Sequence, residues 1–350
     1  MRATYKKYIL NFKRPSGTSR GILKTKETWF IKLQEGGNIG YGECGILRTL
    51  SIDDIPEYEE KLKWTCENIH LGLVVLYQEL MRFPSIQFGL EQAFLSLKSN
   101  DKFKLFPSKF TDNNKGITIN GLVWMGEKSF MKQQISDKIK AGFTCIKMKI
   151  GAIDFETEME LLKSIRKEYS QKDIELRVDA NGAFHPDEAL DKLKILSDLN
   201  LHSIEQPIAV KQFEQMAMLC EQSPLAIALD EELIGVFNSE EKVSILQTIQ
   251  PQYIILKPSL IGGFKGSLEW IALAEKQNIK YWVTSALESN IGLNAISQFT
   301  HTLNTTMPQG LGTGGLYTNN IESPLEIKNG KLQYNNAKCW ELNQNIKFSS

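Results

Sequence analysis

The sequence contains few cysteines, and none of them forms a recognisable pair. The five thiols are scattered along the chain, without a CxxC motif, at Cys44, Cys66, Cys145, Cys220 and Cys339. An odd and dispersed set argues against a disulfide framework and against a zinc site built from thiolates. Because such cysteines suit a reducing compartment, we expect a cytoplasmic protein.

The sequence also lacks long apolar runs and an excess of charge of one sign. No apolar stretch approaches the roughly 20 residues of a membrane-spanning helix, and the first residues show no signal-peptide pattern. Lysine plus arginine total 41, as do aspartate plus glutamate, so the formal net charge is zero. A neutral chain has no global attraction to nucleic acid or to an anionic membrane. We therefore expect a small-molecule partner, while the oligomeric state stays open.

A length of 350 residues, 42% of them hydrophobic, leaves room for more than one unit. The chain opens with three β-rich segments separated by glycine-bearing turns, at residues 2–11, 25–33 and 38–43. Apolar residues then recur at helical spacing over residues 52–70 and 89–100. We predict that residues 1–113 form a small α+β module.

From residue 117 the pattern changes to short apolar strands followed by amphipathic helices. The strand-terminal residues Asp179, Glu205, Asp230 and Lys257 are 26, 25 and 27 positions apart, which fits one strand plus one helix per step. This alternation predicts an α/β fold with parallel strands. A barrel over residues 114–320 is the economical interpretation, although a doubly wound open sheet has the same local pattern. Residues 321–350 form a short C-terminal segment of strand and turn.

Three consecutive strands of this series each end in a carboxylate, in ELRVDA, HSIEQP and LAIALD. Taken singly, Asp179, Glu205 and Asp230 are each explained by a helix cap or a turn. In a parallel barrel, however, the carboxyl ends of the strands share one mouth, and three converging carboxylates repel one another unless a cation lies among them. Oxygen ligands favour a hard ion, and Mg²⁺ is the first choice.

Lysines flank these acids on the neighbouring strands. In TCIKMKI the strand period places Lys147 and Lys149 on the face opposite the apolar side chains, and Lys257 ends YIILKP. A solvated strand edge or a surface lysine before a proline turn is the alternative. Together, however, the lysines and acids place bases on both sides of a metal. That arrangement suits proton abstraction next to a carboxylate, because a divalent ion stabilises the resulting enediolate.

The motifs KMK, DAN, IEQP, ALDEE and LKP around these positions resemble the muconate-lactonizing subgroup of the enolase superfamily. The resemblance covers nearly the whole chain. It implies an N-terminal α+β capping domain, a modified TIM barrel of (β/α)₇β type, and a C-terminal segment that packs back on the cap. A lysine base acting with Mg²⁺ is a known pattern of that superfamily.

The same resemblance implies a role for each charged residue. One Mg²⁺ ion, for which Mn²⁺ is a possible substitute, would be held by Asp179, Glu205 and Asp230. Lys149 would be the proton-abstracting base and Lys147 would tune it. Lys257 would stabilise the intermediate from the opposite face.

Four further segments narrow the likeness to the o-succinylbenzoate synthases, one family of this superfamily. They are GTSRG at 17–21, INGLVWMG at 119–126, SALESNIGL at 285–293 and GLGTGGLYTNN at 310–320. Dipeptide epimerases carry an Asp-x-Asp pair after the last barrel strand, where this chain has Gly-Thr-Gly-Gly. The resemblance implies a hydro-lyase of menaquinone biosynthesis that dehydrates 2-succinyl-6-hydroxy-2,4-cyclohexadiene-1-carboxylate to o-succinylbenzoate.

Other residues are candidates for supporting roles. Arg20 and Ser285 could contact the substrate, and Asn181 and Glu231 could support the metal or Lys257 from behind. An N-succinylamino-acid racemase or a cycloisomerase on the same scaffold is the alternative function, since racemisation needs bases on two faces. A barrel without catalysis that only binds a ligand is the remote alternative.

Overall fold

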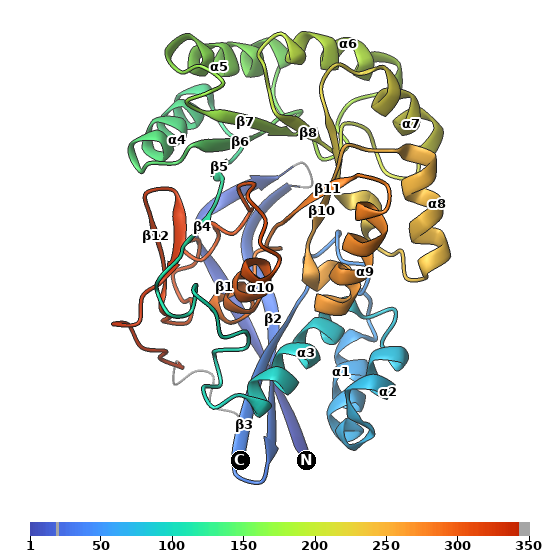
Figure 1. The fold of residues 1–350 in the computed structure, drawn as a ribbon, viewed down its shortest axis with the longest axis vertical. Helices are drawn as coiled ribbons and strands as arrows, with labels where there is room; N and C mark the ends of the chain where they lie inside the picture. The colour runs from blue at the N-terminus through green and yellow to red at the C-terminus, as the bar shows by residue number, and fades with distance from the viewer. Residues whose placement is uncertain (19–20, 343–350) are drawn as a thin grey trace.

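The computed structural model describes residues 1–18 and 21–342. Its N-terminal part is an antiparallel sheet in the order β1-β2-β3, formed by β1 (Arg2–Thr18), β2 (Gly21–Glu35) and β3 (Asn38–Gly45). The three predicted strands are therefore present, and each is longer than its apolar pattern indicated. In Figure 1 this blue sheet runs from the N-terminus up to the barrel.

Three helices pack beside this sheet: α1 (Tyr58–Glu67), α2 (Gly72–Glu79), which follows the single turn η1 (Ile69–Leu71), and α3 (Pro84–Lys98). Helix α3 lies closely against β3. A Cβ atom added at Gly42 would lie 1.9 Å from the carbonyl oxygen of Gly89. Glycine at this position therefore lets the helix approach the strand.

Seven parallel strands form the second sheet, in the spatial order β11-β10-β9-β8-β7-β6-β5. They are β5 (Gly121–Val123), β6 (Cys145–Lys149), β7 (Glu175–Asp179), β8 (Ser203–Glu205), β9 (Ile227–Leu229), β10 (Tyr253–Leu256) and β11 (Lys280–Val283). Helices follow the strands in turn and cover the outside of the curled sheet (Figure 1). They are α4 (Lys128–Lys140), α5 (Phe155–Glu168), α6 (Pro186–Ser197), α7 (Phe213–Gln222), α8 (Ser239–Ile249), α9 (Gly263–Glu275) and α10 (Asn290–Thr302).

Residues 309–310 link the two edges of this sheet. The amide of Asn120, directly before β5, donates to the carbonyl of Gln309 at 3.0 Å, and the amide of Gly310 donates to the carbonyl of Val283 in β11 at 2.8 Å. This segment takes the eighth position of the ring. The predicted (β/α)₇β barrel is confirmed, and the open doubly wound sheet is excluded.

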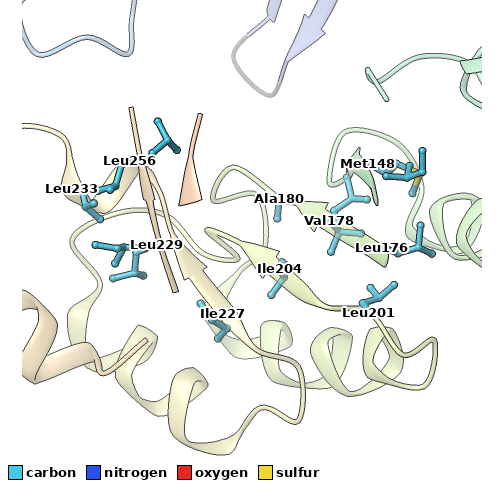
Figure 2. Packing of buried hydrophobic residues seen from close by; sticks show 14 of the residues in the cluster. Met148, Leu176, Val178, Ala180, Leu201, Ile204, Ile227, Leu229, Leu233 and Leu256 are labelled. Atoms are coloured by element: carbon cyan, nitrogen blue, oxygen red, sulfur yellow. The ribbon is translucent and has the colours of Figure 1, made fainter. Parts of the chain in front are cut away.

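The barrel strands bury alternate side chains against the helices. Met148, Val178 and Ile204 are fully buried (Figure 2). They belong to one core with helix residues such as Leu162 and Leu193. Since strand side chains alternate between faces, the residues between these apolar ones point into the barrel. The apolar pattern of the strands therefore sets which side chains reach the site.

The last part of the chain forms a hairpin of β12 (Leu325–Lys328) and β13 (Lys331–Tyr334), and β13 pairs with β4 (Ile117–Thr118). The ring of Trp340 stacks on Phe103 at 4.3 Å between centroids. Among residues 1–18 and 21–342, no helix has the length and apolar character needed to span a bilayer. The division of the chain at residues 113/114 and 320/321 stays a prediction.

Candidate active site

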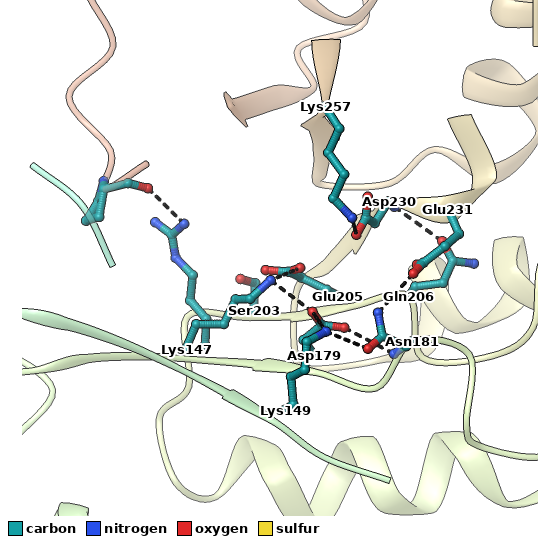
Figure 3. Close-up of polar contacts among 12 residues, drawn as sticks. Lys147, Lys149, Asp179, Asn181, Ser203, Glu205, Gln206, Asp230, Glu231 and Lys257 are labelled. Atoms are coloured by element: carbon teal, nitrogen blue, oxygen red, sulfur yellow. Dashed lines mark hydrogen bonds and ion pairs between the residues drawn. The ribbon is translucent and has the colours of Figure 1, made fainter. Parts of the chain in front are cut away.

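Three acidic side chains meet at the C-terminal end of the barrel strands. Asp179 and Glu205 end β7 and β8 and lie opposite each other in the parallel register, and Asp230 directly follows β9. Each is at most 2% exposed. Because parallel strands bring their carboxyl ends to one mouth, the three carboxylates reach the same region of the barrel (Figure 3).

Two lysines of β6 contact these acids directly. Lys147 Nζ donates to Asp179 Oδ2 at 2.9 Å and to Glu205 Oε2 at 2.5 Å. Lys149 Nζ donates to the same oxygen of Asp179 at 2.9 Å and to Asn181 Oδ1 at 2.6 Å. The strand period thus directs both lysines inward, and the alternative of a solvated edge is wrong for this strand.

A third lysine approaches from β10, across the site. Lys257 Nζ donates to Asp230 Oδ2 at 2.5 Å. On the other side, Asn181 Nδ2 donates to Glu231 Oε1 at 2.9 Å, and Glu231 opens the short helix η2 (Glu231–Leu233). Figure 3 shows Lys257 reaching down toward Asp230, while Lys147 and Lys149 reach Asp179 from their own strand. The two groups of lysines therefore flank the acids.

Burial and opposite charges shift the pKa values of these groups in a consistent way. Burial opposes the charge of Lys147, but the carboxylates of Asp179 and Glu205 outweigh it and raise the pKa of the ammonium. Burial likewise disfavours the Asp179 anion, yet Lys147 and Lys149 hold its pKa well below the usual range. Burial raises the pKa of Glu205, and repulsion from Asp179 and Asp230 adds to that shift. Of the two carboxyl groups that Lys147 contacts, Glu205 is therefore the less compensated.

The residues at the mouth fit a hard divalent cation. Within the described ranges, no three acidic, histidine or cysteine side chains lie close enough together to enclose a metal ion. The lysine ammonium groups contact the carboxylates instead. However, Glu205 Oε1 is buried and has no hydrogen-bond partner in the part of the chain that the structure describes. Hard divalent cations take oxygen ligands, so such an ion would compete with the lysines for these carboxylates.

A cavity of about 160 Å³ opens beside these charged groups. Its floor includes Lys147, Lys149, Asp179 and Lys257. Its walls are mostly apolar and come from both the N-terminal sheet region and the barrel; they include Leu23, Leu47, Trp124, Leu287 and Leu316. Charged groups below apolar walls suit a small molecule that has a hydrophobic ring and a carboxylate.

Comparison with known proteins agrees with this geometry. The model of the family described as "Enolase C-terminal domain-like" matches residues 131–338. The o-succinylbenzoate synthase of Desulfotalea psychrophila is 45% identical to this chain, over 95% of this chain and 98% of the relative. The chain belongs to the o-succinylbenzoate synthase family of the enolase superfamily.

Solved structures extend the likeness to the whole fold. The crystal structure of MenC from D. psychrophila superposes on this o-succinylbenzoate synthase family member with a TM-score of 0.85, at 43% identity, covering 95% of this chain and 99% of the other. The muconate lactonizing enzyme of Pseudomonas fluorescens has a TM-score of 0.81 at 19% identity, covering 97% of this chain and 96% of the other. At this identity the likeness shows a shared fold only. The L-Ala-D/L-Glu epimerase of Bacillus subtilis is 28% identical over only 48% of this chain.

The residues that we predicted to support the site lie in different places. Ser285 lines the cavity, and its hydroxyl contacts that of Thr313 at 2.6 Å. Asn181 also lines the cavity and links Lys149 to Glu231. Arg20 lies outside the described residues.

Enzymes of the enolase superfamily generally use a divalent metal ion.

Two features of the site were not predicted from the sequence: one part of the cavity wall and one residue that supports the acidic side chains. The loop at residues 47–50, which follows β3, lines the cavity although it carries no motif. Gln206, directly after Glu205, accepts a hydrogen bond from the Asp230 amide at 3.2 Å and donates to Glu232 at 3.0 Å. Its position directly after Glu205 in the IEQP motif could have indicated this role, because a buried side-chain amide has to be hydrogen-bonded.

Proposed function

We propose that this protein is an o-succinylbenzoate synthase, a hydro-lyase that dehydrates 2-succinyl-6-hydroxy-2,4-cyclohexadiene-1-carboxylate to o-succinylbenzoate in menaquinone biosynthesis. The observation that carries the proposal is the 45% identity to the D. psychrophila enzyme over nearly both full chains. The lysines and acids around one apolar cavity supply the groups that this reaction needs.

Asp179, Glu205 and Asp230 would hold one Mg²⁺, with Mn²⁺ as a possible substitute. When bound, the ion supplies positive charge where the enediolate oxygens develop negative charge. The support for this assignment is the oxygen-only ligand set and the unpartnered Glu205 Oε1. Asn181 and Glu231 support the ligand Asp179, because the Asn181 backbone amide donates to Asp179 Oδ1 at 3.1 Å and the Asn181 side chain donates to Glu231 Oε1 at 2.9 Å.

Lys149 is the base that removes the proton alpha to the ring carboxylate. Asn181 Oδ1 holds its Nζ at 2.6 Å and so fixes the direction of the amine. The C–H electron pair moves into the enediolate and the proton passes to Nζ. The same ammonium then returns that proton to the departing hydroxide, so water leaves and the ring becomes aromatic.

Lys257 and Lys147 act electrostatically. Lys257 lies across the cavity from Lys149, and Asp230 raises the pKa of its ammonium against the effect of burial. It therefore remains a cation that stabilises the forming ring from the opposite face. Lys147 places a second positive charge beside Lys149 and tunes that base. Ser285, at the cavity wall, is a candidate substrate contact.

A cytoplasmic location is also proposed. All five cysteines are free, and Cys44, Cys145 and Cys220 are buried where no disulfide partner reaches them. Free thiols are typical of proteins in a reducing compartment.

The decisive test is conversion of the cyclohexadiene substrate by the purified protein with and without Mg²⁺. Aromatisation gives the product its own ultraviolet absorbance, so turnover is read directly. We expect product that requires both the metal and Lys149, with Lys149→Ala at least about 10³-fold slower. Folded wild-type protein that forms no product would contradict the assignment.

Racemisation of N-succinylamino acids is the second candidate. The observation that favours it is that Lys149 and Lys257 reach one cavity from opposite sides, as two-base chemistry requires. Optical rotation of an N-succinylamino acid incubated with the protein tests it, with Lys257→Ala as the variant that should abolish exchange on one face. A cycloisomerase or a barrel that only binds ligand would show neither activity.

A further inference from the structure

A second buried cluster of charged and hydroxyl side chains lies where the N-terminal sheet meets the barrel. Its members come from β2, β3, the turn after β10 and the loop before α10. Each is at most 4% exposed. We call this set the clamp cluster: Lys26, Thr28, Glu43, Ser259, Glu288 and Ser289.

Glu43 is the centre of the clamp cluster. Its Oε1 accepts hydrogen bonds from Thr28 Oγ1 at 2.9 Å and from the Ser289 amide at 2.9 Å. Its Oε2 accepts from Ser289 Oγ at 2.5 Å and from the Gly292 amide at 2.8 Å. A carboxylate of the N-terminal sheet therefore caps the first turn of α10, a barrel helix, 246 residues away in sequence.

Glu288 continues the contact toward β10. Its Oε1 accepts a hydrogen bond from Ser259 Oγ at 2.5 Å. Ser259 lies in the short helix η3 (Pro258–Leu260), two residues after Lys257. The clamp cluster thus reaches from the N-terminal sheet, through the loop before α10, to the backbone that follows Lys257.

Lys26 adds the positive charge. Burial raises the pKa of Glu288 above its ordinary value, and the Lys26 ammonium offsets part of that shift. Glycines make room for these side chains. A Cβ atom at Gly45 would lie 2.5 Å from Lys26 Nζ, and one at Gly292 would lie 2.9 Å from Glu43 Oε2.

The clamp cluster lies directly behind two walls of the cavity. Glu43 precedes the loop at residues 47–50, which forms the wall from the N-terminal side. Glu288 and Ser289 follow residues 284–287, which form the facing wall from the barrel. The cluster therefore joins the wall residues of two separate sheets and the turn that carries Lys257.

We propose that the clamp cluster is a positioning device, which holds the two cavity walls and the Lys257 turn in register with the metal side of the site. Its members are positioning residues, because none of them is among the residues that line the cavity. The inference rests on the proposed function. A cluster with a purely structural role would only stabilise the fold. Loss of a positioning cluster should also slow turnover in protein that remains folded.

The first experiment removes one hydroxyl. Ser259→Ala deletes the hydrogen bond to Glu288 and should lower kcat about 10-fold, since small misplacements of a catalytic group are costly. The affinity for Mg²⁺ should remain that of the wild type. Ser267→Ala is the matched control: its buried hydroxyl donates to the Gly263 carbonyl inside α9, away from the cavity, at 2.7 Å. Its kcat should equal that of the wild type.

The second experiment needs no turnover. Glu43→Gln replaces an acceptor of four hydrogen bonds by a group that also donates, so amide hydrogen exchange over residues 285–292 should accelerate at least about 10-fold. Glu91→Gln, which alters another carboxylate that caps a barrel helix, should leave that segment unchanged. Wild-type kcat in Ser259→Ala, or unchanged exchange in Glu43→Gln, would overturn the proposal. Absence of turnover in the wild type would instead contradict the proposed function, and the exchange result would still decide on the clamp cluster.

Discussion

Lys147 is the most enclosed cation of the site, and its removal should be costly. It bridges Asp179 and Glu205, and all three side chains are at most 9% exposed. Lys147→Met keeps most of the volume but leaves two buried carboxylates facing each other. We expect the free energy of unfolding without metal to fall by about 3 kcal/mol. Part of this loss should return when saturating Mg²⁺ supplies the missing charge.

Urea unfolding in EDTA and in Mg²⁺ measures both effects of Lys147→Met. Lys194→Met is the matched control, because its ion pair with Asp191 lies on the exposed surface of α6 and contributes little to stability. Equal unfolding free energies for the Lys147 variant and the wild type in EDTA would contradict the role of Lys147 as the compensating charge.

The site lysines and acids were predictable from the sequence because each one interrupts or ends an apolar strand. Asp230, for example, directly follows the apolar strand Ile227–Leu229. A helix cap or a turn explains one such residue, but it is a weak explanation when three neighbouring strands all end in a carboxylate. Lys26 and Glu43 gave no such signal. They lie in strands where polar and apolar residues alternate, so nothing local distinguishes a buried charge from a solvated one. Only their contacts across the interface with the barrel bury them.

Helix α9 depends on a carboxylate from a different module. Glu91 on α3 accepts hydrogen bonds from the amides of Phe264 and Lys265, in the first turn of α9. Burial raises the pKa of this carboxyl to about 7, from 4.5 in the unfolded chain. Between these values the folded state keeps a proton that the unfolded state has released. Stability from this group is therefore lost as pH rises from about 4.5 to about 7.

Glu91→Gln should remove that pH dependence. The free energy of unfolding of the wild type, relative to the variant, should decrease by up to about 3 kcal/mol between pH 4.5 and pH 7 and stay constant above. Urea titrations at several pH values measure the difference. Glu79→Gln on α2 alters an exposed carboxylate and should show a constant difference. A difference for Glu91→Gln that grew with pH would contradict the sign of the shift.

The sequence predicted the order of elements better than their extent or their contacts. Apolar runs located the barrel strands. Strands β1 and β2 extend past their apolar pattern because backbone pairing alone continues their ladder, as from Ser16 to Leu23. The closure of the barrel by residues 309–310 followed only from the family resemblance, since its backbone hydrogen bonds leave no apolar pattern in the sequence.

At the scale of the whole molecule, metal binding and folding should be linked. The proposed ligands come from the ends of three neighbouring strands, and they converge only when these strands are paired. A cation that binds the folded state alone stabilises it by RT ln(1 + [L]/Kd), about 2.7 kcal/mol at 100 times Kd. We therefore expect Mg²⁺ to raise the midpoint of thermal unfolding, and Ca²⁺ to do so less if the site prefers the smaller ion.

Asp179→Asn tests whether this stabilisation comes from the proposed site. The asparagine keeps the shape of the side chain but removes the charge that both Lys147 and Lys149 contact, so the metal-free variant should already unfold at a lower temperature. Its midpoint should no longer respond to Mg²⁺. Asp173→Asn provides the control, because that exposed carboxylate accepts hydrogen bonds from Ser170, outside the site, and its loss should leave the response intact. A full Mg²⁺ response in Asp179→Asn would place the ion elsewhere and would leave the three strand-end carboxylates to the lysines alone.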